Sequence, residues 1–205
     1  MIILIKGIPD CGKSAFAEQL VLDACYKSNG KNSNESNEEN AGKSSRESTA
    51  GNIGMTDRLY IATMVPCGEE GRQRVLKHRA MRDGKGFITL ECPERLDDII
   101  PEVEKHKSPI CLLECISNLC GNVMHMDEYK DKPEDELCEL ITESVLRLSE
   151  SCRELYAVTN EFEQSESNYD DETVRYIRLT HKVNMALTEI ADKLYEYGNG
   201  GFVIK

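Results

Sequence analysis

The residues best suited to phosphate chemistry lie in a glycine-rich loop close to the amino terminus. In order they are Gly7, Ile8, Pro9, Asp10, Cys11, Gly12, Lys13 and Ser14. The glycines permit backbone conformations in which successive N–H groups point at phosphate oxygens, and Lys13 adds a mobile cation. The Ser14 hydroxyl is a ligand for Mg²⁺, which bridges phosphate oxygens. The pattern therefore predicts a P-loop that binds a nucleoside triphosphate with Mg²⁺.

A second group of candidate residues is a basic stretch over residues 74–82. Its basic members are Arg74, Lys77, His78, Arg79 and Arg82. On a helix, His78 lies one turn after Arg74 and one turn before Arg82, so the three share one face. Neutral imidazole is nucleophilic and neighbouring cations hold phosphates, which makes His78 a candidate acceptor of a phosphoryl or nucleotidyl group. The alternative is a solvated basic face with an incidental histidine.

Glu114 is the third candidate, because it directly follows the apolar run 109–113. If this run is a strand of an open α/β sheet, Glu114 lies at the carboxyl edge, where such folds bind ligands. There its carboxylate could approach Mg²⁺ or a sugar hydroxyl. A lone acidic residue at a strand end can equally be only solvated, and the sequence leaves both interpretations open.

The composition describes an acidic chain of single-domain size. With 205 residues and 40% hydrophobic content, we expect one domain over residues 1–205. The formal net charge of -12 disfavours nucleic-acid partners. We expect no membrane span and no leader, and nine cysteines indicate a reduced, cytoplasmic location. The spacing of Cys111, Cys115 and Cys120 is not that of a zinc knuckle, so buried thiols are expected.

The elements that position these residues alternate between strands and helices. An apolar strand over residues 2–6 precedes the loop, and a helix over 15–26 follows it. Residues 28–56 form a polar, low-complexity segment that we predict to be a disordered insertion, a regulatory or docking tail being the alternative. Further strands are predicted at 59–63, 86–91, 109–114, 154–159, 193–197 and, at an edge, 201–205.

Helical patterns fill most of the gaps between these strands. The clearest is the last, where Val183, Leu187, Ile190 and Leu194 form one stripe. Strands that alternate with helices predict an α/β fold with a mostly parallel sheet covered by helices, of the P-loop NTPase type, with the insertion after the first helix.

Blocks along nearly the whole chain resemble the adenosylcobinamide kinase/adenosylcobinamide-phosphate guanylyltransferase family. Beyond the P-loop, they are residues 59–63, then Arg74, His78, Arg79 and Arg82 with Phe87, Thr89 and Glu91, then 112–115, 158–161, 183–184, 191–192 and 201–205. The blocks occur in the order of the family, which makes the resemblance more specific than any one of them.

The resemblance implies a bifunctional enzyme of cobalamin biosynthesis. ATP or GTP would phosphorylate adenosylcobinamide, and GTP would then guanylylate a histidine, at the position of His78, from which GMP passes to the corrinoid phosphate to give adenosylcobinamide-GDP. It also implies nucleotide contacts, beyond the P-loop, from Thr63, Met64, Arg79, Ala80, Met81, Arg82, Glu91 and Glu114. The expected substrates are ATP, GTP and the corrinoid, and the expected assembly is a homo-oligomer, commonly a trimer.

The chain departs from the family in three places. Residues 162–172 are acidic and contain neither glycine nor proline, where the family has a glycine-containing segment ending near a proline. Phe87 replaces a usual tryptophan, and the insertion at 28–56 is atypical. The alternatives are therefore an enzyme that keeps only one activity, or a nucleotide-dependent sensor that does not act on a corrinoid.

Overall fold

The computed structural model describes residues 1–31, 56–162 and 169–205. In these ranges seven strands form one sheet in the order β3-β2-β4-β5-β1-β6-β7. The strands are β1 (Ile2–Gly7), β2 (Arg58–Ala62), β3 (Phe87–Glu91), β4 (Ile110–Glu114), β5 (Glu154–Asn160), β6 (Lys193–Gly198) and β7 (Gly201–Ile204). All pairings are parallel except that of β6 with the edge strand β7.

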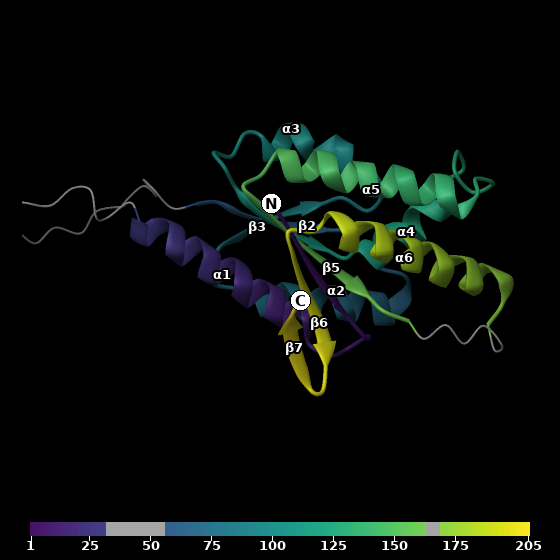
Figure 1. Ribbon diagram of the computed structural model, residues 1–205, viewed down its shortest axis with the longest axis horizontal. Coiled ribbons are helices and arrows are strands. Elements are labelled where there is room, and N and C mark those ends of the chain that lie inside the picture. Colours follow the sequence, from purple (N-terminus) through teal and green to yellow (C-terminus); the bar gives the residue numbers. More distant parts are fainter. Residues whose placement is uncertain (32–55, 163–168) are drawn as a thin grey trace, which may run out of the picture.

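Helices cover both faces of this sheet (Figure 1). They are α1 (Lys13–Lys31), α2 (Gly68–Arg82), α3 (Ile100–Val103), α4 (Ile116–His125), α5 (Glu134–Glu150) and α6 (Asp171–Ile190), with a 3-10 turn at Leu96–Ile99. Figure 1 shows α1 on one side of the sheet and α5 on the other. The predicted α/β class, the mostly parallel sheet and the helical cover are confirmed.

The alternation of side chains along the strands builds two cores. In β1, Ile3 and Ile5 face α1 and pack with its Val21, whereas Leu4 joins the larger core on the opposite face. That larger core is formed with α4, α5 and α6, for example through Leu148 and Leu187. Because both faces are covered, the inner strands are continuous apolar runs, which is why their positions follow from the sequence.

The parallel pairing brings three strand ends together. β5 lies between β1 and β4, with Asn160 opposite Gly7 and Val158 opposite Glu114. The carboxyl end of β1 leads into the P-loop, and that of β4 ends in Glu114. The predicted phosphate loop and the predicted carboxylate therefore meet at one edge of the sheet.

Two details differ from the predicted elements. The helix after the P-loop continues to Lys31, so residues 28–31 belong to α1, and residues 32–55 of the predicted insertion lie outside the described residues. The predicted stripe of the last helix is wrong at Leu194, because α6 ends at Ile190. Asp192 accepts from the backbone N–H of Ile2 at 2.7 Å, and Leu194 then pairs with β1 in strand β6.

The described cysteines are free thiols, and Cys111, Cys115 and Cys120 are buried in the core. Among the described residues, no three His, Cys, Asp or Glu side chains are grouped so that they could hold a metal ion. Helices in the same ranges are too short or too polar to cross a lipid bilayer.

The central strand β4 gives a test of this core. Leu113 is fully buried between the two neighbouring strands, so Leu113→Ala should lower the free energy of unfolding by about 2–5 kcal/mol. Leu76 on α2 is 55% exposed, so Leu76→Ala should change it by less than about 0.5 kcal/mol. Urea unfolding followed by circular dichroism measures both values, and equal effects would contradict the placement of the core.

Candidate active site

The P-loop takes its shape from two residues in the left-handed region of backbone conformation. Asp10 and Gly12 have φ angles of 58° and 90°. Gly7 lets the loop close, because a Cβ there would lie 2.8 Å from both Cys11 Sγ and Tyr197 Cβ. The Lys13 ammonium folds over the loop and donates to the Ile8 carbonyl at 2.6 Å. The loop thus places a cation at the positive end of α1, as phosphate binding requires.

Glu114 meets the P-loop from the end of β4. The Ser14 hydroxyl donates to Glu114 Oε1, while Glu114 Oε2 is buried and has no hydrogen-bond partner in the described part of the chain. Burial raises the pKa of Glu114, the bond from Ser14 opposes this rise, and the charge of Glu18 adds to it. A buried carboxylate oxygen without a partner, next to a hydroxyl, is suited to a ligand that brings its own positive charge or donor.

The basic residues of α2 face the same place. The Arg82 guanidinium lies on the Tyr60 ring, with 3.4 Å between its carbon and the ring centroid. His78, one turn earlier, is half-buried. Arg82 Nη1 and His78 Nδ1 are both buried without a hydrogen-bond partner among residues 1–31, 56–162 and 169–205. Burial first, and the charge of Arg82 second, lower the pKa of His78. The lowered pKa favours the neutral imidazole, which is the nucleophilic form.

Two ion pairs hold α2 and the turn after it against the rest of the site. Arg79 pairs with Glu91 at the end of β3, with 3.0 Å between Nη2 and Oε1. Lys85 pairs with Glu18 of α1, whose side chain is fully buried. The Arg79 pair is exposed, so it contributes little to stability but keeps the guanidinium near the cavity.

These groups surround a cavity of ≈520 Å³ that joins the P-loop to His78. Of the residues predicted for the site, it is lined by Pro9, Asp10, Gly12, Lys13, Ser14, Met64, His78, Arg79, Met81, Arg82, Glu91 and Glu114. The structure thus brings together the two segments that the sequence singled out separately. Gly7, Ile8, Cys11, Thr63 and Ala80 do not line the cavity.

Thr63 has a different place from the one that the resemblance implies. Its side chain is fully buried, donates to the Cys115 carbonyl at 2.8 Å and accepts from the Cys115 N–H at 2.7 Å. Asn122 donates to the Thr63 carbonyl at 2.7 Å. Thr63 therefore joins the end of β2 to that of β4 and fixes the strand ends that carry Met64 and Glu114.

Sequence reasoning missed Tyr60, Asn118 and Asn160 as lining residues. Tyr60 lies within an apolar strand, and nothing in that stretch of sequence links it to Arg82. The contact between its ring and Arg82 arises because β2 faces α2 in the fold. Asn160 directly follows the predicted strand 154–159, and this position at a strand end is the signal that could have found it. Its amide donates to Ser117 Oγ at 2.8 Å. Asn118 follows Glu114 by four residues and has no signal of its own.

Gly7 provides a test of the loop geometry. The methyl group of Gly7→Ala must displace both Cys11 and Tyr197, so the affinity for a fluorescent ATP analogue should fall by about 10-fold or more. Gly198→Ala is the matched control, because a Cβ there meets no atom within 4 Å. Titration by fluorescence anisotropy measures both, and an unchanged affinity in Gly7→Ala would contradict a loop closed around this glycine.

The fold has a counterpart among solved structures. An ATPase domain of known structure is similar, with a TM-score of 0.52, 11% identity, and coverage of 97% of this chain and 69% of that chain. At this identity the likeness shows the fold alone. No curated protein matches the chain.

The family model that matches is "cobinamide kinase / cobinamide phosphate guanyltransferase", over residues 38–203. The match begins after the P-loop and α1, so the assignment of the phosphate loop rests on its own sequence and geometry. It includes the α2 basic residues, Glu91 and Glu114, which line the cavity. Because the match covers most of the sequence, the chain belongs to the cobinamide kinase / cobinamide phosphate guanyltransferase family, the bifunctional kinases and nucleotidyltransferases of cobalamin biosynthesis.

Proposed function

We propose that this one cavity performs both family reactions, with the P-loop as the triphosphate site and His78 as the covalent carrier of GMP. The observation that carries the proposal is the joining of Lys13 and His78 by one cavity, in which burial and the charge of Arg82 lower the pKa of His78. The kinase step transfers the γ-phosphate of ATP or GTP to a hydroxyl of adenosylcobinamide. The transferase step moves GMP from GTP to the new phosphate, which gives adenosylcobinamide-GDP.

In the kinase step the acceptor hydroxyl attacks the γ-phosphorus and loses its proton to solvent. The bond from that phosphorus to the β–γ bridging oxygen breaks, and ADP or GDP leaves. The residues of the chain act by position and charge, because phosphoryl transfer depends on both. The backbone N–H groups of the loop, from residues other than Pro9, hold the phosphates, and Lys13 exchanges its bond to the Ile8 carbonyl for a phosphate oxygen. The loss of one carbonyl contact is small beside a charge-assisted bond to phosphate.

The residues at the loop also fit Mg²⁺. Ser14 and Glu114 supply hard oxygen ligands in contact with each other. Glu114 Oε2 is buried and forms no hydrogen bond with any of the described residues. Mg²⁺ in such sites uses one or two side chains and takes its other ligands from phosphates and water. When bound, it would neutralise charge on the phosphates. Ser14 and Glu114 are accordingly the proposed metal-binding residues.

In the transferase step an imidazole nitrogen of His78 attacks the α-phosphorus of GTP, an N–P bond forms, and pyrophosphate leaves. An oxygen of the corrinoid phosphate then attacks the same phosphorus, the N–P bond breaks, and His78 is returned. Arg82 and Arg79 lie within the same cavity wall and stabilise the charge on the transferring group. Stacking on Tyr60 holds the Arg82 guanidinium in place for this role.

The remaining proposed residues support the nucleotide less directly. Met64, Met81 and Glu91 line the cavity, and Thr63 fixes the strand ends that carry Met64 and Glu114. Ala80 lies on α2 between Arg79 and Arg82 and does not line the cavity. A homo-oligomer, with a trimer as the expected state, stays a prediction that light scattering coupled to size exclusion can decide.

Covalent labelling tests the carrier role directly. Wild-type protein incubated with α-labelled GTP should retain acid-labile label, and His78→Ala should reduce it to background, because no other side chain replaces the nucleophile. His125→Ala is the control, since His125 is exposed on α4 and pairs with Glu172. Label should be counted after rapid gel filtration in the absence of corrinoid. Equal labelling of wild type and His78→Ala would rule out the covalent mechanism.

The pH dependence of labelling tests the environment of His78. Its lowered pKa keeps the neutral form present to lower pH, and labelling should be lost only as pH falls through that lowered pKa. Arg82→Gln removes one of the causes, so the acid limb should move to higher pH. Arg72→Gln is the control, because Arg72 is exposed and pairs with Glu69. Single-turnover labelling across pH gives the midpoints, and a midpoint unchanged in Arg82→Gln would contradict the assigned cause.

A further inference from the structure

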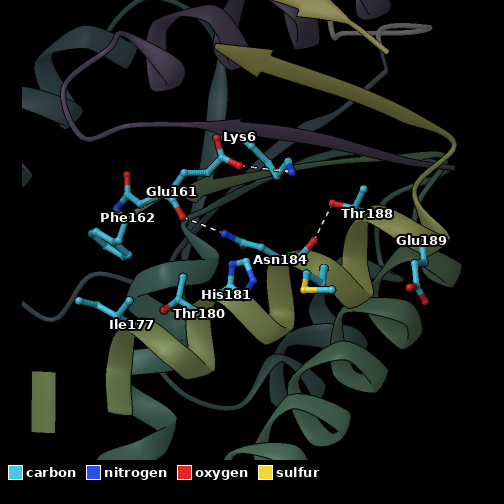
Figure 2. A pocket seen from close by; sticks show the side chains of 11 residues that line it. Lys6, Glu161, Phe162, Ile177, Thr180, His181, Asn184, Thr188 and Glu189 are labelled. Carbon is cyan, nitrogen blue, oxygen red and sulfur yellow. Dashed lines mark hydrogen bonds and ion pairs between the residues drawn. The ribbon is translucent and has the colours of Figure 1, made fainter. Parts of the chain in front are cut away.

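A second cavity, of ≈440 Å³, lies beside the nucleotide cavity between the ends of β1 and β5 and the helix α6 (Figure 2). Figure 2 shows Lys6 and Glu161 at the strand ends facing Thr180, Asn184 and Thr188 of α6. None of the residues assigned to the triphosphate or to GMP lines it. We call it the acceptor cavity, because its position and charge suit the acceptor of the transferred phosphate.

The acceptor cavity directly adjoins the P-loop. Asn160 lines both cavities, and the Glu161 N–H donates to the Gly7 carbonyl at 2.9 Å. Asn184 of α6 donates to the Asn160 carbonyl at 2.9 Å and accepts from Thr159 at 2.7 Å, so its amide belongs to the framework. A group bound in the acceptor cavity is therefore separated from the phosphate loop only by the strand ends of β1 and β5.

The charge of the acceptor cavity excludes a second nucleotide. Lys6 is its buried cation, but Glu161 and Glu196 already neutralise the ammonium, with N–O distances of 3.4 Å and 3.0 Å. Glu189 adds a further carboxylate to the wall. An excess of carboxylates repels phosphates and suits a neutral ligand that carries N–H donors.

Apart from these charged groups, the wall combines apolar side chains, such as Met185 and Phe162, with polar ones that include the Thr180 hydroxyl and the His181 imidazole. Met185 is 55% exposed at the cavity although it is a large apolar side chain, and Phe162 packs on Tyr176 with 5.4 Å between ring centroids. The Thr180 Oγ1 is buried and lacks a hydrogen-bond partner within the described ranges. The cavity therefore offers an apolar surface, carboxylate acceptors and a buried hydroxyl to one ligand.

We propose that the acceptor cavity binds the carboxamide-bearing edge of the corrinoid acceptor, an inference that rests on the proposed function. A carboxamide is neutral, donates N–H to the carboxylates of Glu161 and Glu189, and offers a carbonyl to the Thr180 hydroxyl. The apolar skeleton that carries the amides covers Met185. The cavity accommodates one edge of such a ligand, and the remainder extends over the sheet edge towards the P-loop, where the hydroxyl must meet the γ-phosphate.

Equilibrium dialysis with adenosylcobinamide tests this site, in the presence of a non-hydrolysable ATP analogue. Glu189→Lys and Met185→Glu should each weaken corrinoid binding by about 10-fold or more, since one reverses a charge and the other adds a charge to the apolar wall. The matched controls are Glu139→Lys and Leu146→Glu, exposed positions of α5 outside both cavities, which should bind like wild type. Thermal melting followed by circular dichroism verifies that every variant is folded.

The affinity for the ATP analogue is measured on the same samples. Weaker corrinoid binding with retained nucleotide affinity supports the acceptor cavity. Wild-type corrinoid affinity in both Glu189→Lys and Met185→Glu overturns the acceptor cavity and leaves the proposed function standing. An equal loss of nucleotide and corrinoid binding also overturns the acceptor cavity, because the effect is then not specific to the corrinoid. If the wild-type protein binds the ATP analogue but no adenosylcobinamide, the kinase part of the proposed function fails, and the assigned occupant of the cavity fails with it.

Discussion

The hydrogen bond from Ser14 to Glu114 is the contact on which the rest of the site depends. It joins the first residues of α1 to the end of β4, two strands away from β1 in the sheet. The bond is short-range, but its geometry is set by long-range packing. β5 fixes the spacing of β1 and β4 through continuous parallel pairing, and the Thr63 bonds to Cys115 fix the end of β4 relative to β2. A phosphate loop without this support would have its N–H groups but no carboxylate opposite them.

The same region carries polar groups that the fold leaves unsatisfied. His78 Nδ1, Arg82 Nη1 and Glu114 Oε2 are buried without partners in the described part of the chain, although such groups cost about 1–3 kcal/mol each. Apolar side chains would pack better at these positions, so the arrangement favours ligand binding over stability. The direction of each pKa shift agrees with this interpretation. Burial disfavours the charged forms of both His78 and Glu114, and a phosphate or a cation would restore charge partners to the site.

Features set by local sequence could be predicted, and features set by contacts between distant segments could not. The inner strands are buried on both faces, so their apolar runs marked them, and the helical spacing of Arg74, His78 and Arg82 marked one face of α2. On α2 the spacing of basic residues, rather than of apolar ones, identifies this face, because the helix buries only Gly71 and Arg82. By contrast, Tyr60 supports Arg82 because β2 faces α2, and α6 ends before Leu194 because Asp192 bonds to β1. Neither contact leaves a pattern in its own stretch of sequence.

The distribution of charge also explains how one acceptor can serve two reactions. Within the described residues of this acidic chain, Lys13 and Arg82 on the side of the P-loop and α2 form no ion pair with a carboxylate. Lys6 on the other side is neutralised by two glutamates. Under the proposed function the corrinoid enters without a phosphate and becomes a phosphate ester. That phosphate is attracted to the side of Lys13 and Arg82 and repelled by the carboxylates of the acceptor cavity. The neutral edge of the corrinoid can therefore keep its place while its reacting end stays among the cations, where His78 carries the GMP that the phosphate must attack.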